Sequence, residues 1–91
     1  MAAPQGRARN KLKMIILQYL LDHGSSTIYE VATGLGVERH NVANACLRLK
    51  RSYLVTRMKV PGWHNRNVWT LEITQKGLDR LAYYKDLELE T

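Results

Sequence analysis

The sequence predicts an α+β domain that is mainly helical, with three helices followed by a two-stranded β-hairpin and a C-terminal helix. The main observation is a change in hydrophobic period. Apolar residues recur every three or four positions up to about residue 52, then alternate with polar residues in two short segments, and then return to helical spacing. A chain of 91 residues has room for one core, so these elements are expected to form one domain.

The first helix is expected over residues 11–23, with Asn10 as its N-cap and Gly24 as its C-terminal stop. Residues 1–10 have little to bury and are predicted to form a flexible basic arm, which leaves 11–91 as the folded domain. The arm either adds phosphate contacts or has no role. Its basic residues, with those that open the helix, are Arg7, Arg9, Lys11 and Lys13.

A bend between the second and third helices is predicted around Gly36. Thr27 and Glu30 have the spacing of a capping box, so the second helix begins at residue 28. A helix-turn-helix needs a small residue, a residue that tolerates positive φ and a branched apolar residue, and Ala32, Gly36 and Val42 have that order. The third helix follows, and one apolar face is expected to be buried: Val42, Ala45, Cys46 and Leu49.

The hairpin is predicted from the alternating segments "LVTRMKV" and "VWTLEI", joined by "PGWHNRN". Trp69 lies in the second strand and is expected in the core. Thr74 can cap the last helix, and Gly77 in its first turn indicates close packing there.

The net charge of +6 favours a polyanionic partner, either nucleic acid or an anionic membrane surface. Residues 38–68 contain seven basic residues and one acid, so this third of the chain carries as much charge as the whole. No apolar run is long enough to span a bilayer. Cys46 is the only cysteine, which excludes an internal disulfide and favours a reducing compartment, so a cytoplasmic protein is expected.

Catalytic, metal and cofactor sites are not expected. Gly34 and Gly36 begin a dinucleotide-binding pattern, but Arg39 occupies the third glycine position and no strand precedes the motif. The carboxylates are scattered and do not form the pairs that general acid–base catalysis uses. The sequence predicts no pocket for a small molecule. The residues that could bind a metal lack ligand spacing: His23, His40, His64 and Cys46.

With the segments "LRLKRSYLVTRM" and "WTLEITQKGLDRL", the chain resembles winged helix-turn-helix regulators of the MarR and PadR kind over about residues 11–85. "LRLKRSYLVTRM" is similar to the end of their recognition helix and their first wing strand. "WTLEITQKGLDRL" is similar to their second wing strand and the helix after it, with Thr74, Lys76 and Gly77 as the most distinctive part. Two features differ: Tyr53 stands where the family usually has glycine, and the last helix is too short for the long dimerisation arms of MarR proteins.

The resemblance implies that the third helix, about 38–52, enters the DNA major groove and that the wing, about 60–68, lies at the minor groove and backbone. The residues placed toward bases are Arg39, His40, Asn41 and Asn44. Those placed on the DNA backbone are Arg48, Lys50, Arg51, Arg57 and Lys59. The wing residues are Trp63, His64 and Arg66. For Trp63 there are two alternatives: it packs against the sugar-phosphate surface, or it closes the wing onto the core.

The function expected from these features is sequence-specific binding of double-stranded DNA by a small transcriptional regulator that acts as a homodimer. The dimer contact is placed on the last helix and packs with the first; its residues are Leu78, Leu81, Tyr84 and Leu87. The alternative is a winged-helix module that binds a protein partner or structured RNA, because a fold does not determine a function.

Overall fold

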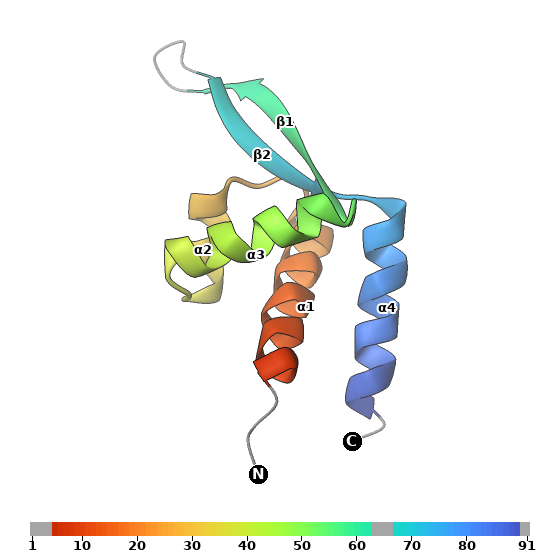
Figure 1. Ribbon diagram of the computed structural model, residues 1–91. Coiled ribbons are helices and arrows are strands. Elements are labelled where there is room, and N and C mark those ends of the chain that lie inside the picture. Colours follow the sequence, from red (N-terminus) through yellow and green to blue (C-terminus); the bar gives the residue numbers. More distant parts are fainter. Residues whose placement is uncertain (1–4, 63–66, 90–91) are drawn as a thin grey trace.

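Three helices, a β-hairpin and a fourth helix make up the computed structural model, which describes residues 5–62 and 67–89, with side chains over 11–62 and 67–86. The helices are α1 (Gln5–His23), α2 (Ile28–Leu35), α3 (Arg39–Arg51) and α4 (Gln75–Leu89), and the strands are β1 (Val55–Pro61) and β2 (Asn67–Ile73). The hairpin projects from one end of the helical body, and α4 runs back beside α1 (Figure 1). This order confirms the predicted fold class.

Helix α1 begins at Gln5, six residues before the predicted start, so Asn10 lies inside the helix and is not its N-cap. Residues 5–9 contain one weak helix former, Gly6, beside glutamine, alanine and two arginines, which favour helix. That summed preference outweighs the capping tendency of one asparagine. The helix ends as predicted, since Gly24 has a φ of 78° and its N–H donates to the Leu20 carbonyl at 2.9 Å.

The bend between α2 and α3 is formed as the sequence predicts. The Thr27 hydroxyl accepts from the Glu30 N–H at 3.0 Å, and a Glu30 carboxylate oxygen accepts from the Thr27 N–H at 2.9 Å. Gly36 is left-handed, with a φ of 67°, and ends α2. Gly34 has a different role, because a Cβ built on it would lie 2.5 Å from the Tyr19 ring of α1. Thus one glycine turns the chain and the other allows α1 and α2 to pack closely.

The core lies between the helices and the base of the hairpin. The predicted inner face of α3 is confirmed, with all four residues buried, and α1 and α2 supply most of the facing side chains. Burial raises the pKa of the Cys46 thiol to about 12, so this thiol stays protonated at neutral pH and is not an activated nucleophile. The core residues from the first three helices are Ile16, Leu17, Leu20, Val31, Ala32, Val42, Ala45, Cys46 and Leu49.

The hairpin is antiparallel, and its register places Val55 opposite Ile73 and Lys59 opposite Trp69. Because side chains alternate along a strand, one face carries buried Val55 and Leu71 at its base and exposed residues farther out. The backbone of Ser26 pairs with Leu71 through two hydrogen bonds of 2.7 and 3.1 Å, which attach the hairpin to the loop before α2. The base of the hairpin is therefore fixed to the helical body.

The start of α4 packs closely against the backbone of Leu54, as the glycine at position 77 predicts. A Cβ at this position would overlap the Leu54 carbonyl oxygen and lie 2.7 Å from Ile73. Thr74 supplies the predicted cap, since its hydroxyl accepts from the Gly77 N–H at 3.0 Å. The same hydroxyl donates to the Tyr53 carbonyl at 2.7 Å. The turn after α3 and the start of α4 are thereby held together.

The expected dimer residues of α4 require a correction. Leu81 and Tyr84 are 2% and 7% exposed, because both fill the protomer's own core and so offer almost no surface to a second chain. Leu78 is half-buried. The side chain of Leu87 lies outside the part of the chain that the structure describes. The helical spacing of apolar residues correctly identified a buried face on α4. That face is covered by α1 of the same chain, and the prediction had assigned it to a second copy.

Tyr53 has a φ of 61°, in the left-handed region that favours glycine. A non-glycine residue pays about 1–2 kcal/mol for the left-handed conformation, and the Tyr53 side chain is 74% exposed and buries little in return. Tyr53→Gly is therefore expected to raise the free energy of unfolding by about 1 kcal/mol and the Tm by about 4–8 °C. Thermal and urea unfolding followed by circular dichroism measures both.

The control for this prediction is Tyr53→Ala, which removes the ring and keeps the left-handed strain. Its stability should stay close to that of the unaltered protein, so that only the glycine variant gains. Equal gains from alanine and glycine would show that the tyrosine ring, rather than its backbone conformation, lowers stability.

Candidate nucleic-acid interface

The outward face of α3 carries a stripe of exposed side chains spaced four, three and four residues apart. This spacing returns to the same side of a helix, opposite the buried face. The stripe consists of His40, Asn44, Leu47 and Arg51. Two of these were predicted to face bases and Arg51 to contact the backbone, but Leu47, which is 47% exposed, was missed. The same spacing rule that identifies the buried face would have found it.

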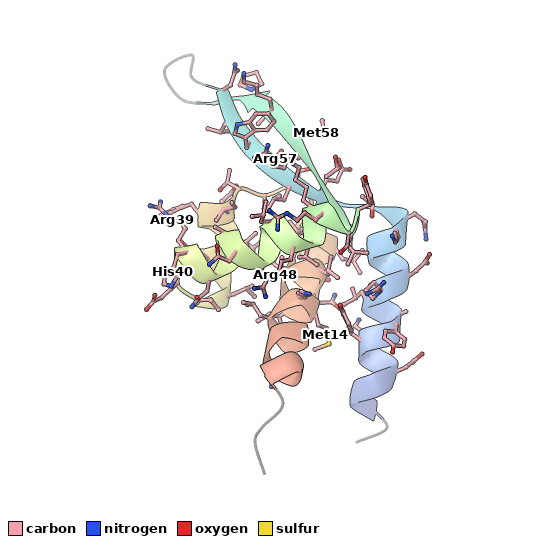
Figure 2. The ribbon with its side chains drawn as sticks, viewed as in Figure 1. Met14, Arg39, His40, Arg48, Arg57 and Met58 are labelled. Atoms are coloured by element: carbon pink, nitrogen blue, oxygen red, sulfur yellow. The ribbon has the colours of Figure 1, made fainter. Side chains whose placement is uncertain are left out.

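The remaining polar residues of α3 lie on its two flanks. Lys50 and Arg39 share the flank toward the hairpin, whereas Arg48 and Asn41 share the flank toward α1, about 160° away around the helix axis. Figure 2 shows Arg39 and His40 near the start of α3 and Arg48 farther along, over α1. All four flank residues are exposed. The polar side of the helix is thus wider than the central stripe.

His40 has a nearby acidic side chain. Its Nδ1 atom lies 3.1 Å from a carboxylate oxygen of Glu38, the residue before α3. Both side chains are about 70% exposed, and a contact this open to water contributes little free energy. His40 can therefore leave Glu38 when a stronger partner arrives.

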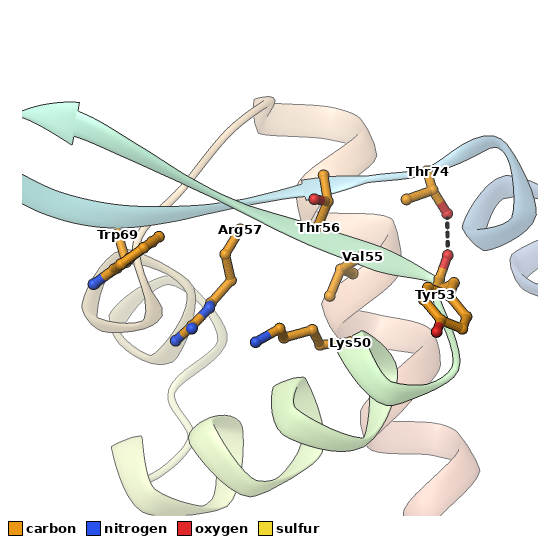
Figure 3. Close-up of a pocket in the computed structure, with 7 residues that line it drawn as sticks. All are labelled: Lys50, Tyr53, Val55, Thr56, Arg57, Trp69 and Thr74. Carbon is orange, nitrogen blue, oxygen red and sulfur yellow. Dashed lines mark hydrogen bonds between the residues drawn. The ribbon is translucent and has the colours of Figure 1, made fainter.

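A hollow of about 450 Å³ separates the end of α3 from the hairpin. Lys50 reaches into it from α3 and Arg57 from β1, as Figure 3 shows. Trp69 lies beside Arg57, and the guanidinium carbon lies 4.5 Å from the centre of the tryptophan ring. We call this the wing hollow; its lining is Lys50, Tyr53, Val55, Thr56, Arg57, Trp69 and Thr74.

Trp69 is 50% exposed, so the prediction that it belongs to the core is wrong. Side chains alternate along β2 as predicted, and Trp69 lies on the same face as buried Leu71. The hairpin, however, projects beyond the helical body (Figure 1), and half of the Trp69 side chain stays exposed. The ring instead contacts cations, since Lys59 Nζ lies 5.8 Å from its centre in addition to Arg57.

The wing hollow is electropositive because its cations have no acidic neighbours. No Asp or Glu is among the lining residues. Over residues 11–62 and 67–86, the only contact within 4.0 Å between a basic side-chain nitrogen and a carboxylate oxygen is that of His40 and Glu38. Unpaired cations on facing elements attract an anion, and the tryptophan ring limits the conformations of Arg57 before the anion arrives. The chemistry of this hollow therefore suits a phosphate group.

Three predicted wing residues, Trp63, His64 and Arg66, lie outside the residues that the structure describes. Arg57 and Lys59 are exposed, and they lie on the same face of the hairpin as Val55 and Leu71. Within the described ranges, His, Cys, Asp and Glu form no group of three or more that could hold a metal ion. No helix in those ranges is both long and apolar enough to cross a bilayer.

Comparison with known proteins finds similarity in structure. No protein-family profile matches the sequence, and no curated protein matches it either. A MarR family protein from Bacillus stearothermophilus superposes with a TM-score of 0.67 and 20% identity, over 98% of this chain and 55% of that one. A transcriptional regulator homologue from Pyrococcus horikoshii gives 0.72 and 22%, over 85% and 75%.

A third similar structure is the apo-Zalpha of zebrafish PKZ, with a TM-score of 0.60 and 29% identity. It matches 75% of this chain and 98% of its own length. This chain spans little more than half the length of two MarR-family structures, 55% and 58%. The shared part contains the three helices and the hairpin described above, so the chain has the winged helix-turn-helix fold found in MarR-family proteins.

Proposed function

We propose that the protein binds double-stranded DNA in a sequence-specific manner, with α3 in the major groove and the hairpin along the neighbouring backbone and minor groove. The observation that carries this proposal is the exposed stripe of α3 directly beside the electropositive wing hollow. A stripe of hydrogen-bonding side chains can read base edges, and cations beside it can hold the phosphates that flank those bases.

The central stripe and the start of α3 supply the base contacts. Asn44 can bond adenine through two hydrogen bonds, and Arg39 can do the same with guanine. Leu47 offers an apolar contact to the methyl group of thymine. His40 and Asn41 lie beside them. Together these side chains include donors, acceptors and an apolar surface, which is what discrimination among base pairs requires.

Backbone contacts come from both sides of α3. Lys50 and Arg57 hold one phosphate in the wing hollow, and Lys59 extends this contact along the hairpin. Arg51 ends the central stripe and reaches a phosphate beyond the bases. Arg48 lies on the other flank. In this arrangement the predicted wing residues Trp63, His64 and Arg66 approach the minor groove.

The biological role we propose is that of a small intracellular transcriptional regulator that acts as a homodimer. Two of the similar solved structures are described as transcription regulators, which supports this role. A single module of this size covers little DNA, and two copies on symmetric half-sites raise affinity and specificity. The dimer surface must exclude Leu81 and Tyr84, because both are buried within the protomer.

Selection of bound oligonucleotides from a random duplex pool, followed by titration across salt, tests the proposal. Enrichment of a common sequence is expected. Six to ten phosphate contacts should weaken binding by about 10³–10⁵ between 50 and 200 mM salt. A pool without enrichment, together with affinity that does not change with salt, would contradict it.

A protein partner is the second candidate, and it is favoured by apolar side chains on the outer face of the hairpin. Met58 and Val68 are 46% and 37% exposed there. Replacing Arg39 and Asn44 with alanine separates the candidates, because it should relax DNA sequence preference while leaving binding to a protein partner unchanged.

A further inference from the structure

A second, smaller hollow lies between α1 and α3, with a volume of about 210 Å³. Lys13 of α1 and Arg48 of α3 both line it, and Asn41 and Asn44 add two side-chain amides. No carboxylate is among its lining residues. We call it the α1 hollow; its lining is completed by Leu12 and Ala45.

Its position relative to the wing hollow indicates a role. The two hollows lie on opposite flanks of α3, one reached by Lys50 and the other by Arg48. A helix inserted into a major groove has one phosphate backbone on each side of it, about 12 Å apart across the groove. The surface of this protein therefore has a cationic recess on each side of the helix.

Two features of the α1 hollow favour a phosphate over a base. Its two cations come from different helices and line one recess that has no acid among its lining residues, which suits a compact anion. The Asn41 amide can donate a hydrogen bond to a phosphate oxygen, as asparagine side chains do in protein–DNA complexes. Asn41 lies on this flank and away from the central stripe, so the hollow also accounts for its position.

We propose that the α1 hollow binds a backbone phosphate of the DNA strand opposite the one held by the hairpin, with Lys13 and Arg48 supplying the charge and Asn41 a hydrogen bond. Helix α1 thereby becomes part of the DNA interface. This inference rests on the proposed DNA binding, and it moves Asn41 from base contact to backbone contact.

Lys13→Gln tests it, with Lys85→Gln on α4 as the matched control. Lys85 has the same charge and is exposed, but it lines neither hollow. Binding to a 20-base-pair duplex is measured by fluorescence anisotropy from 50 to 200 mM salt. Lys13→Gln should lower the slope of log affinity against log salt by about 0.9 for each bound protomer, the value for one lost phosphate contact. Lys13→Arg should retain the slope, because it keeps the charge.

The outcomes separate this inference from the proposed function. A smaller slope for Lys13→Gln alone supports the α1 hollow. If the unaltered protein shows steep salt dependence and Lys13→Gln matches it, the α1 hollow is overturned while DNA binding stands. Equal losses in both glutamine variants also overturn it, since net charge alone would then account for the change. If the unaltered protein binds no duplex, the proposed function fails first.

Discussion

Gly77→Ala is expected to lower the free energy of unfolding by about 2–3 kcal/mol and the Tm by about 10–20 °C, because a methyl group at this position meets backbone. The added Cβ would overlap the Leu54 carbonyl oxygen, and a carbonyl held in the fold cannot rotate away as a side chain can. Alanine has a higher helix propensity than glycine by about 1 kcal/mol, which offsets part of the cost of the overlap. The expected loss of stability is the net of these two effects. Urea and thermal unfolding followed by circular dichroism give both quantities.

Gly36→Ala is the matched control for this prediction. A Cβ on Gly36 meets nothing within 4 Å, and the only cost is the left-handed φ of 67°. We expect a loss of about 1 kcal/mol there, so the Gly77 variant should be the less stable of the two. The opposite order would mean that α4 shifts away from Leu54 with little cost and that its docking is looser than the structure shows.

The second large effect is expected in DNA recognition, from a pair of substitutions on α3. Asn44→Ala removes a neutral amide from the central stripe, so it should weaken binding to the selected sequence by about 1–3 kcal/mol, with little change on unrelated duplexes. Lys50→Ala removes a charge from the wing hollow, so it should weaken binding to all sequences and lower the salt slope by about 1. Anisotropy titrations on selected and scrambled duplexes measure both effects.

Each variant serves as the control for the other, because they are on one helix and both side chains are exposed. Exchanged behaviour, with sequence preference lost in Lys50→Ala and the salt slope lowered in Asn44→Ala, would require α3 to be rotated in the groove. Circular dichroism of both proteins excludes unfolding as the cause, since neither position belongs to the core.

Local features of the fold were predictable because neighbouring residues determine them. The capping box of Thr27 and Glu30 and the left-handed Gly36 depend on residues within a few positions. The buried face of α3 follows from helical spacing, and Gly77 indicated close packing because glycine is unusual in the first turn of a helix. The start of α1 was missed because summed helix preference outweighed the capping tendency of Asn10.

The candidate site was predicted in part. Spacing along α3 identified most of its exposed residues, and the strand alternation placed Arg57 and Lys59 on one face of the hairpin. The pairing of Arg57 with Trp69 could not be inferred, because the sequence does not show where the hairpin leaves the body. The burial of Leu81 and Tyr84 was likewise hidden, since an apolar helix face fits its own core and a second chain equally well.

By itself, the sequence determined the order of the elements, the caps of α2 and α4, the helix-turn-helix bend and the concentration of positive charge in residues 38–68. Only the tertiary structure decided which surfaces face each other: Lys50 with Arg57 across one hollow, and Lys13 with Arg48 across the other. The physical reason is the range of the interactions involved. Caps, turns and hydrophobic periods act within a few residues, whereas the two hollows depend on how separate elements pack, and that packing is set by the core as a whole.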